Sequence, residues 1–366
     1  MATSGGQRFP RLPVTPPVAP MLATLAPTLP VADHYYEPKW DGFRCVAFRS
    51  GSGTLLQSRN QRPLDRYFPE LVAGLRAIGR DSFVLDGEIV AAGANGLDFA
   101  ALMLRLHPST SRVDRLRLET PASFVAFDLL AVGAIDLRTA PAIERRARLV
   151  ELLADAHPGV VATPATDDST EAASWLERFT GGGIDGVVAK AVASAYEPRR
   201  RSRSWLKAKP ERTADCVVGG FRWVQGEPLV ASLLLGLYDG AGDLRHVGVA
   251  ANFSAGRRRE LFRALQPYST SLSGHPWEHG FALERGPMGR LKGAAGAWDP
   301  TTMTQDWAPV RPVLVCEVAY DHVDAMRRWR HPARFRRWRP DRDPLSCTFD
   351  QVAFSPPELA DVLQMP

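Results

Sequence analysis

A change of pattern at Pro210 is the feature of this sequence that most constrains its fold. Before Pro210, segments with strand character are mixed irregularly with amphipathic helical segments, which favours an α+β domain over a regular βαβ repeat. After Pro210, short apolar runs are separated by glycine turns, and one clear helix is indicated after Ser254, as in a small β-barrel. The strand-like runs are 43–48, 83–91, 123–132, 216–221, 231–238, 245–249 and 313–319, and the helical patterns begin at Pro69, Ile143 and Asp168.

The length of the chain fits this division, because 366 residues are enough for about two domains of ordinary size. We therefore predict a first domain over residues 31–210 and an all-β barrel over residues 211–366. Residues 1–30 hold seven of the thirty prolines and few charges. This composition predicts an extended Pro-rich N-terminal arm that joins the first domain.

The sequence predicts a cytoplasmic protein that does not cross a membrane. The longest apolar run, Leu229–Tyr238, is about half the length that a bilayer span needs, and no secretory signal is visible. The four cysteines are widely scattered without a CxxC pair, which fits a reducing compartment better than a disulfide framework.

The kind of basic residue is more informative than the net charge of +5, which is compatible with a polyanionic partner without requiring one. Of 45 basic residues only five are lysines, so the chain strongly prefers arginine. An arginine cannot be deprotonated in a protein, so a reaction that uses a neutral amine as nucleophile must retain a lysine. The few lysines therefore mark the places to look for chemistry.

The first lysine motif is Lys39-Trp40-Asp41-Gly42-Phe43-Arg44, a KxDGxR pattern directly before a predicted strand. Four specified residues in one short window are expected by chance well under ~1% of the time in a chain of this length. The alternative is a strand that begins after a glycine turn and carries exposed charges.

A pair of carboxylates occurs in the strand-like segment Phe83–Val90. At the two-residue period of a strand, Asp86 and Glu88 point to one face while Leu85 and Ile89 point to the other. Such a pair can hold a divalent cation or a ribose hydroxyl, and the alternative is a solvated strand face.

Two further segments contain lysines. In Ile184–Lys190, Asp185 and Lys190 are expected on opposite faces of a strand. In Trp205–Lys209, Lys207 and Lys209 share a face with Trp205, a spacing that suits a phosphate chain; the alternative is an exposed basic edge strand. Four of the five lysines fall in these three motifs, which favours function over chance.

Together these motifs resemble the nucleotidyltransferase core shared by ATP-dependent DNA ligases, RNA ligases and mRNA-capping enzymes. The segments that carry the resemblance lie in the family's order, at Lys39–Arg44, Ser58–Asn60, Asp86–Glu88, Phe124–Leu130, Asp185–Lys190 and Trp205–Lys209. Within the family the chain is most similar to bacterial repair ligases of the small actinobacterial LigC type, on the segments Ser58–Asn60, Arg66–Leu71, Arg330–Pro332 and Arg339–Arg342. The resemblance implies an adenylation domain of antiparallel sheets with helices, followed by an OB-fold barrel.

The resemblance also implies roles in nucleotide binding. Lys39 would attack the α-phosphate of ATP, release pyrophosphate and become a lysyl-AMP. Glu37 and the ring of Phe127 would select and stack adenine, and Arg44 and Glu88 would hold the ribose and phosphate. AMP would then pass to the 5'-phosphate of DNA, from which a 3'-hydroxyl would displace it.

Further roles implied by the resemblance concern phosphates and metal. Arg59 would bind the 5'-phosphate of a nick. Arg339 and Arg342 would bind the departing pyrophosphate. The α-phosphate would be held by Lys190, Lys207 and Lys209, and Mg²⁺ or Mn²⁺ would be held by Asp185 and Glu88.

Three positions depart from the family pattern. Gln61 stands where many relatives have glycine, Asp185 replaces the usual glutamate, and Arg342 replaces the usual lysine. These differences bear on geometry and metal preference more than on the class of reaction.

We therefore predict an ATP-dependent DNA ligase for DNA repair, acting on nicked or gapped double-stranded DNA as a monomer, with a repair polymerase or primase as a candidate partner. An RNA ligase or a guanylyltransferase of the same superfamily is the nearest alternative. A non-catalytic DNA-binding repair scaffold is the alternative from a different class.

Overall fold

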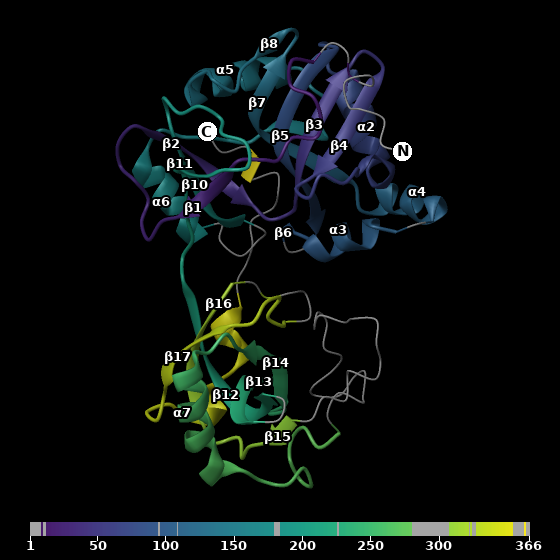
Figure 1. Cartoon of the computed structure of the whole chain (residues 1–366). Coiled ribbons are helices and arrows are strands. Elements are labelled where there is room, and N and C mark those ends of the chain that lie inside the picture. The colour runs from purple at the N-terminus through teal and green to yellow at the C-terminus, as the bar shows by residue number, and fades with distance from the viewer. Residues whose placement is uncertain are drawn as a thin grey trace. The chain divides into compact units, whose positions relative to one another are not determined.

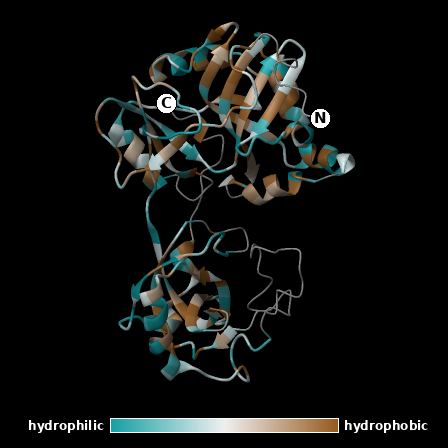
Figure 2. Ribbon diagram, in the orientation of Figure 1, coloured by the Kyte–Doolittle hydropathy of each residue, from teal (hydrophilic) through white to brown (hydrophobic). Residues whose placement is uncertain are grey.

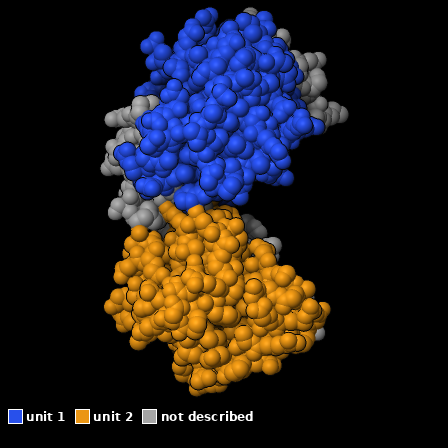
Figure 3. Space-filling view, turned by 90° about the vertical axis from the view of Figure 1, so that its left-hand side faces the viewer, with its two compact units in different colours: residues 1–210, 355–366 blue, residues 211–354 orange. Residues whose placement is uncertain are grey.

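The computed structural model describes residues 9, 12–93, 96–107, 109–178, 184–224, 227–279, 307–321, 323, 327–353 and 362–363. The chain divides into two compact units, one of Met1–Pro210 with Ser355–Pro366 and one of Glu211–Phe354 (Figure 1; Figure 3). This division differs from the predicted second domain of 211–366 at its end. Val362 is buried in the same apolar cluster as Tyr36 and Trp40 of the first unit. Among the residues described, no helix is long and apolar enough to cross a bilayer.

The first unit contains two β-sheets, whose paired strands are antiparallel except in two pairs. The larger sheet has β4 (Gly53–Ser58), β3 (Phe43–Ser50), β5 (Ser82–Gly93), β7 (Ala122–Val132) and β8 (Ile135–Asp136) in this order, with β6 (Gly96–Leu97) beside β5 and β9 (Val160–Ala162) beside β7. The smaller sheet has the order β1 (Leu22–Leu25), β11 (Arg201–Ala208), β10 (Ile184–Ala191), β2 (His34–Trp40). The parallel pairs are β1 with β11 and β7 with β9.

Strand β5 shows why the larger sheet lies at the centre of this unit. Phe83, Leu85 and Ile89 are fully buried in the cluster on one face of the sheet, as the two-residue period predicted. The opposite face is also covered, because Val84 and Asp86 are fully buried as well. The alternative of a solvated face is therefore wrong for β5. Figure 2 shows the apolar colouring of these central strands.

Helices pack around the sheets in the part of this unit that the structure describes. Helices α2 (Pro69–Ala77) and α5 (Ala142–Leu153) contribute buried leucines to the cluster over the larger sheet, and α6 (Ser169–Arg178) packs on β2 and β10. These three helices confirm the predicted patterns. Helices α3 (Phe99–Arg105) and α4 (Thr110–Glu119) were not predicted; α3 begins where the Asp98 side chain accepts a hydrogen bond from the Ala101 N–H at 2.9 Å.

The N-terminal segment packs into the first unit, which corrects the prediction of an arm that is only extended. Its apolar side chains are buried against the larger sheet, and β1 adds a parallel strand to β11. Prolines keep such a segment extended, but they do not prevent the apolar residues between them from entering a core. The buried residues are Phe9, Leu12, Val14, Val18 and Met21.

The second unit is an OB-fold barrel with one six-stranded sheet. Its main path is β14 (Leu244–Ala250), β13 (Glu227–Tyr238), β12 (Arg212–Val224), β16 (Val315–Tyr320), β17 (Arg334–Trp338), with β15 (Trp307–Pro309) paired to β12. A bridge from Ala250 to Ala333 brings the two ends of this path together. Helix α7 (Ala255–Leu265) begins after Ser254, whose side chain accepts a hydrogen bond from the Arg257 N–H. The predicted strands and helix of this region are confirmed. Lys292, the one lysine outside the three motifs, lies outside the described residues.

Candidate active site

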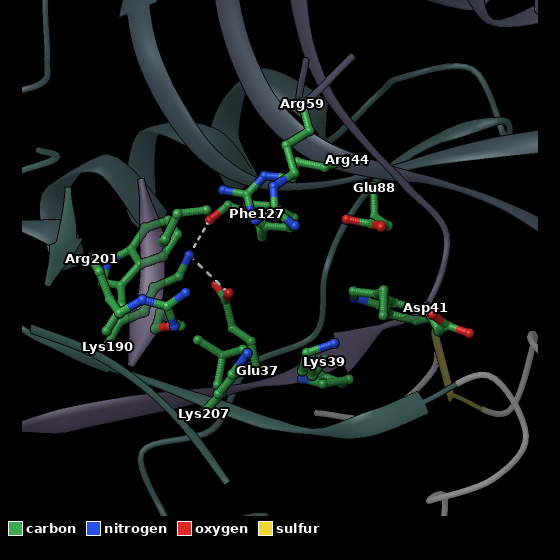
Figure 4. Close-up of a pocket in the computed structure, with 16 residues that line it drawn as sticks. Glu37, Lys39, Asp41, Arg44, Arg59, Glu88, Phe127, Lys190, Arg201 and Lys207 are labelled. Carbon is green, nitrogen blue, oxygen red and sulfur yellow. Dashed lines mark hydrogen bonds and ion pairs between the residues drawn. The ribbon is translucent and has the colours of Figure 1, made fainter. Parts of the chain in front are cut away.

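A pocket of about 230 Å³ lies between the two sheets of the first unit and contains most of the predicted site residues (Figure 4). Strands of both sheets supply its walls, so the pocket depends on how the sheets pack together. Its lining residues are Leu22, Ala23, Glu37, Pro38, Lys39, Trp40, Asp41, Arg44, Arg59, Glu88, Phe127, Val188, Lys190, Arg201, Trp205 and Lys207.

One end of the pocket gathers lysines around a single carboxylate. The Lys39 ammonium donates to Asp185 Oδ2 at 2.5 Å, and the Lys209 ammonium contacts the same oxygen. The pKa of Lys207 is lowered by burial and by the neighbouring cations Lys39, Lys209 and Arg201. Lys209 therefore joins the site through Asp185, although neither residue is among those that line the pocket.

The other end of the pocket is built around Glu37, which is buried. Its Oε2 accepts a hydrogen bond from the Lys190 ammonium at 2.9 Å, and Lys190 also donates to the Phe127 carbonyl at 2.5 Å. Burial raises the pKa of Glu37, against the opposing effect of Lys190 and Arg146. Glu37 Oε1 is 3.9 Å from the Arg146 guanidinium and accepts no hydrogen bond from the residues that are described. Arg146 was not predicted.

A β-bulge explains how Asp185 and Lys190 reach the same pocket. From Ile184 to Val187, β10 advances three residues while β2 advances two, and Gly186 within this step has a φ of +135°. The extra residue reverses the alternation of side chains, so both Asp185 and Lys190 contact one face of β2. The prediction that they lie on opposite faces is therefore wrong.

The position of Gly186 also requires a residue without a side chain. A Cβ atom at this position would lie 2.1 Å from the Ala208 carbonyl oxygen of β11. The bulge is therefore tied to close packing between two strands.

Aromatic rings and cations form the wall beside Glu37. The Arg44 guanidinium lies 4.4 Å from the centre of the Phe127 ring, and the Lys190 ammonium lies 4.4 Å from that of Trp205. The two rings meet edge to face with their centroids 6.3 Å apart. Trp205 Nε1 is buried and has no hydrogen-bond partner among the described residues.

Arg44 and Glu88 come from neighbouring strands, β3 and β5. Arg44 makes a two-pronged ion pair with Asp86, at 2.6 Å from Nε and 2.7 Å from Nη2. Glu88 Oε1 accepts a hydrogen bond from the Gly42 N–H at 3.2 Å. Burial raises the pKa of Glu88 to about 7, although Arg44 and Lys39 oppose this shift. Asp86 thus binds Arg44, whereas Glu88 binds the Gly42 backbone.

Arg59 lines the same pocket, just after β4. Its N–H donates to the Arg44 carbonyl at 3.1 Å, which ties this turn to β3. Gln61, at a position where the resemblance to the family implies a glycine, has a φ of +61°. The turn therefore keeps a left-handed conformation that glycine adopts more easily.

Arg201 is a pocket residue that was not predicted. It lies on β11, where the two-residue period places it on the face of Trp205 and Lys207. That spacing could have identified it from the sequence.

Arg339 and Arg342 belong to the second unit, where both pair with a carboxylate. Arg339 Nη1 is 3.0 Å from both oxygens of Asp215 and also bonds to Asp341, and Arg342 Nε is 3.4 Å from Asp215. Asp215 was not predicted, and no motif marks it.

Family comparisons add to this geometry. A sequence model described as "ATP dependent DNA ligase domain" matches residues 20–209, and one described as "ATP dependent DNA ligase C terminal region" matches residues 226–342. The chain belongs to the ATP-dependent DNA ligase family. The resemblance inferred from its motifs is thus confirmed.

Similar proteins agree with this assignment. This ligase is 48% identical to "DNA ligase C2" of Mycolicibacterium smegmatis over 96% of its own length and 98% of that protein. It is 47% identical to "DNA ligase C" of Mycobacterium tuberculosis, over 93% of its own length and 95% of the relative. These matches support the LigC type and DNA ligase activity rather than an RNA ligase, a guanylyltransferase or a non-catalytic scaffold.

The fold has a counterpart among solved structures. A chain from "DNA binding with a minimal scaffold: Structure-function analysis of Lig E DNA ligases" matches with a TM-score of 0.55 over 88% of this ligase and 99% of that chain. The sequence identity is 19%, so this likeness supports the fold alone.

Proposed function

We propose that this ligase seals nicks in DNA through an AMP bound covalently to Lys39. The amine attacks the α-phosphate of ATP, a P–N bond forms, and the P–O bond to pyrophosphate breaks. AMP then moves to the DNA 5'-phosphate, and the 3'-hydroxyl displaces it to form the phosphodiester. The observation that carries the proposal is that Lys39, which contacts Asp185, lines one pocket together with Lys207, the buried Glu37 and the Phe127 ring.

Glu37 and Phe127 are the proposed base-binding residues. Glu37 Oε1 is buried and accepts no hydrogen bond from the described residues, so it fits the exocyclic amino group of adenine, which donates hydrogen bonds. Guanine has a carbonyl at the corresponding position and would leave this oxygen unpaired. Because the Lys190 ammonium donates to Glu37 and to the Phe127 carbonyl, we propose that Lys190 orients Glu37 at the base end rather than holding the α-phosphate.

We propose that the Asp185 carboxylate accepts the proton of the Lys39 ammonium. The lysine amine must lose a proton before it attacks, and Asp185 Oδ2 lies 2.5 Å from the nitrogen that carries it. Lys207 and Lys209 then face the α-phosphate, where fixed cations stabilise the charge that develops in the transition state. Arg44 and Glu88 would hold the ribose and phosphate.

The donor set also fits a hard divalent cation. Among the described residues there is no group of three or more metal-ligating side chains, but Mg²⁺ commonly uses one or two carboxylates together with substrate phosphates. Asp185 and Glu88 would hold Mg²⁺ or Mn²⁺, which would neutralise phosphate charge when bound. Glu88 would be competent for this in its ionised form.

The remaining assignments extend the proposal to DNA. We propose that the first unit is the adenylation domain and that Arg59 binds the 5'-phosphate of the nick. Arg339 and Arg342 of the OB-fold domain bind the departing pyrophosphate. The substrate is nicked or gapped double-stranded DNA, the enzyme is a cytoplasmic monomer that serves DNA repair, and a repair polymerase or primase is its candidate partner.

Self-adenylylation tests the core of the proposal. The full chain is incubated with α-labelled ATP and magnesium, with α-labelled GTP in parallel, and covalent label is measured after denaturation. We expect label from ATP alone and none in Lys39→Arg, because arginine offers no neutral amine. Covalent AMP retained by Lys39→Arg would contradict the assignment of Lys39. Sealing of nicked DNA but not of nicked RNA would support the substrate.

A further inference from the structure

A buried hydrogen-bond network extends from the nucleotide pocket to Tyr196. The Tyr196 hydroxyl donates to Asp86 Oδ2 at 2.6 Å and accepts a hydrogen bond from the Met21 N–H at 3.0 Å. Asp86 in turn holds the Arg44 guanidinium through both of its oxygens. Arg44 also donates to the Met21 carbonyl at 3.3 Å. Three segments far apart in sequence therefore converge on one arginine of the pocket.

The network is closed off from solvent. Tyr196 is 3% exposed, and Asp86 and Met21 are fully buried. Burial and the Asp86 charge raise the pKa of Tyr196 well above its ordinary value, so its hydroxyl is protonated at neutral pH and can donate to Asp86. A buried carboxylate with a charged partner and a neutral donor is strongly held.

The hydroxyl supplies an orientation that Asp86 cannot set by itself. The terminal torsion of an aspartate is broad, so its side chain does not by itself fix the plane of the carboxylate. Arg44 binds that carboxylate through two parallel hydrogen bonds, so its direction follows the plane. The third hydrogen bond, from Tyr196 to Oδ2, fixes the plane of the carboxylate.

The Tyr196 ring is anchored as well. It packs edge to face on Trp205 with the centroids 5.7 Å apart, and Trp205 lines the pocket beside Phe127. The position of the hydroxyl is therefore set by the same wall that faces the nucleotide.

We propose that Tyr196 is a positioning residue for ATP binding, which acts through Asp86 to hold the Arg44 guanidinium toward the pocket. The inference rests on the proposed role of Arg44 in binding the nucleotide. Tyr196 itself does not line the pocket, and its hydroxyl is connected to the pocket through Asp86 and Arg44, so we expect the hydroxyl to affect ATP binding through Arg44.

The test compares two tyrosines that differ in this connection. Tyr196→Phe removes the hydroxyl and retains the ring on Trp205. Tyr36→Phe is the matched control, because Tyr36 is also buried in the first unit and its hydroxyl donates to the Pro30 carbonyl at 2.6 Å, away from Arg44. For each full-length variant, the KM for ATP and the single-turnover rate of self-adenylylation at saturating ATP are measured, together with the thermal midpoint.

We expect Tyr196→Phe to raise the KM for ATP about 10-fold, with a smaller change in the rate at saturation, as for one lost hydrogen bond to a charged group. Tyr36→Phe should leave the KM and the rate unchanged. The two variants should lower the thermal midpoint by similar amounts. An equal KM in the two variants would overturn the inference, because the hydroxyl would then contribute only to stability.

A double-variant cycle separates this inference from the proposed function. Because Tyr196 acts only through Arg44, the double variant Arg44→Ala with Tyr196→Phe should have the same KM as Arg44→Ala alone. Additive effects would overturn the inference while leaving the role of Arg44 intact. If Arg44→Ala itself leaves the KM for ATP unchanged, the proposed role of Arg44 is wrong, and the inference fails with it.

Discussion

Replacing Glu88 with glutamine should stabilise the folded ligase above pH 7 although it removes a site residue. Burial raises the pKa of Glu88 from 4.5 to about 7, so the folded chain holds this proton more tightly than the unfolded chain. The free energy of unfolding is therefore highest below pH 4.5, falls as pH rises towards 7 and is constant above it. The pKa is raised by about 2.5 units, and at about 1.4 kcal/mol per unit the ionised Glu88 costs roughly 3 kcal/mol of unfolding free energy at pH 8. The neutral amide of Glu88→Gln avoids this cost.

The assay is urea unfolding of the full chain by circular dichroism at pH 4.5, 6 and 8. The difference between Glu88→Gln and the unmodified chain should be near zero at pH 4.5 and approach about 3 kcal/mol at pH 8. The amide oxygen can still accept the Gly42 N–H, so no packing is lost. Glu197→Gln, at an exposed ion pair with Arg200, is the control and should show little change at any pH.

Two results would refute this reasoning. A difference independent of pH would mean that the burial of Glu88 does not penalise its charge. A destabilised variant at pH 8 would mean that the interactions of Glu88 with Arg44 and Lys39 outweigh burial. Self-adenylylation should also rise with pH through about 7 in the unmodified enzyme, as Glu88 ionises, and this rise should be lost in Glu88→Gln.

Three further predictions concern the lysines, the C-terminal arginines and the barrel. Lys207→Ala should slow self-adenylylation about 10²- to 10³-fold, whereas Lys292→Ala should change it little; equal losses would indicate a generic charge effect. The double variant Arg339→Ala with Arg342→Ala should lose self-adenylylation but still seal a nick that already carries 5'-AMP, and normal self-adenylylation would contradict the pyrophosphate role. Burial lowers the pKa of His246 from 6.5 to about 3, so the stability of the second unit should fall by about 1.4 kcal/mol per pH unit from pH 6 to 4, and His246→Phe should reduce this slope in urea titrations.

The sequence was informative where chemistry and periodicity act locally. The scarcity of lysine directed attention to Lys39 and Lys207, and the two-residue period identified the buried face of β5 correctly. Both inferences use only residues that are neighbours along the chain. The family motifs then supplied the order of the segments that meet in the pocket.

Contacts between distant segments were not visible in the same way. Arg146 and Tyr196 reach the site from outside every motif, and each does so only because the two sheets pack together. The N-terminal segment was misjudged because its prolines indicated extension, while its apolar residues are widely spaced and match neither a helical nor a strand period. Met21 joins the network around Arg44 through its backbone, which no side-chain pattern can reveal.

The bulge in β10 bears on Asp185, which stands where the resemblance to the family implies a glutamate. An aspartate side chain is shorter than a glutamate side chain by one carbon–carbon bond, about 1.5 Å. Its backbone must therefore lie closer to the lysines for the carboxylate to reach them. In this ligase the carboxylate contacts both Lys39 and Lys209, and the extra residue at Gly186 is what turns it to the face of Lys39. The absent Cβ of Gly186 allows β10 to approach the Ala208 carbonyl closely at that step. The shorter acid therefore still reaches Lys39, and its placement depends on a glycine that does not line the pocket.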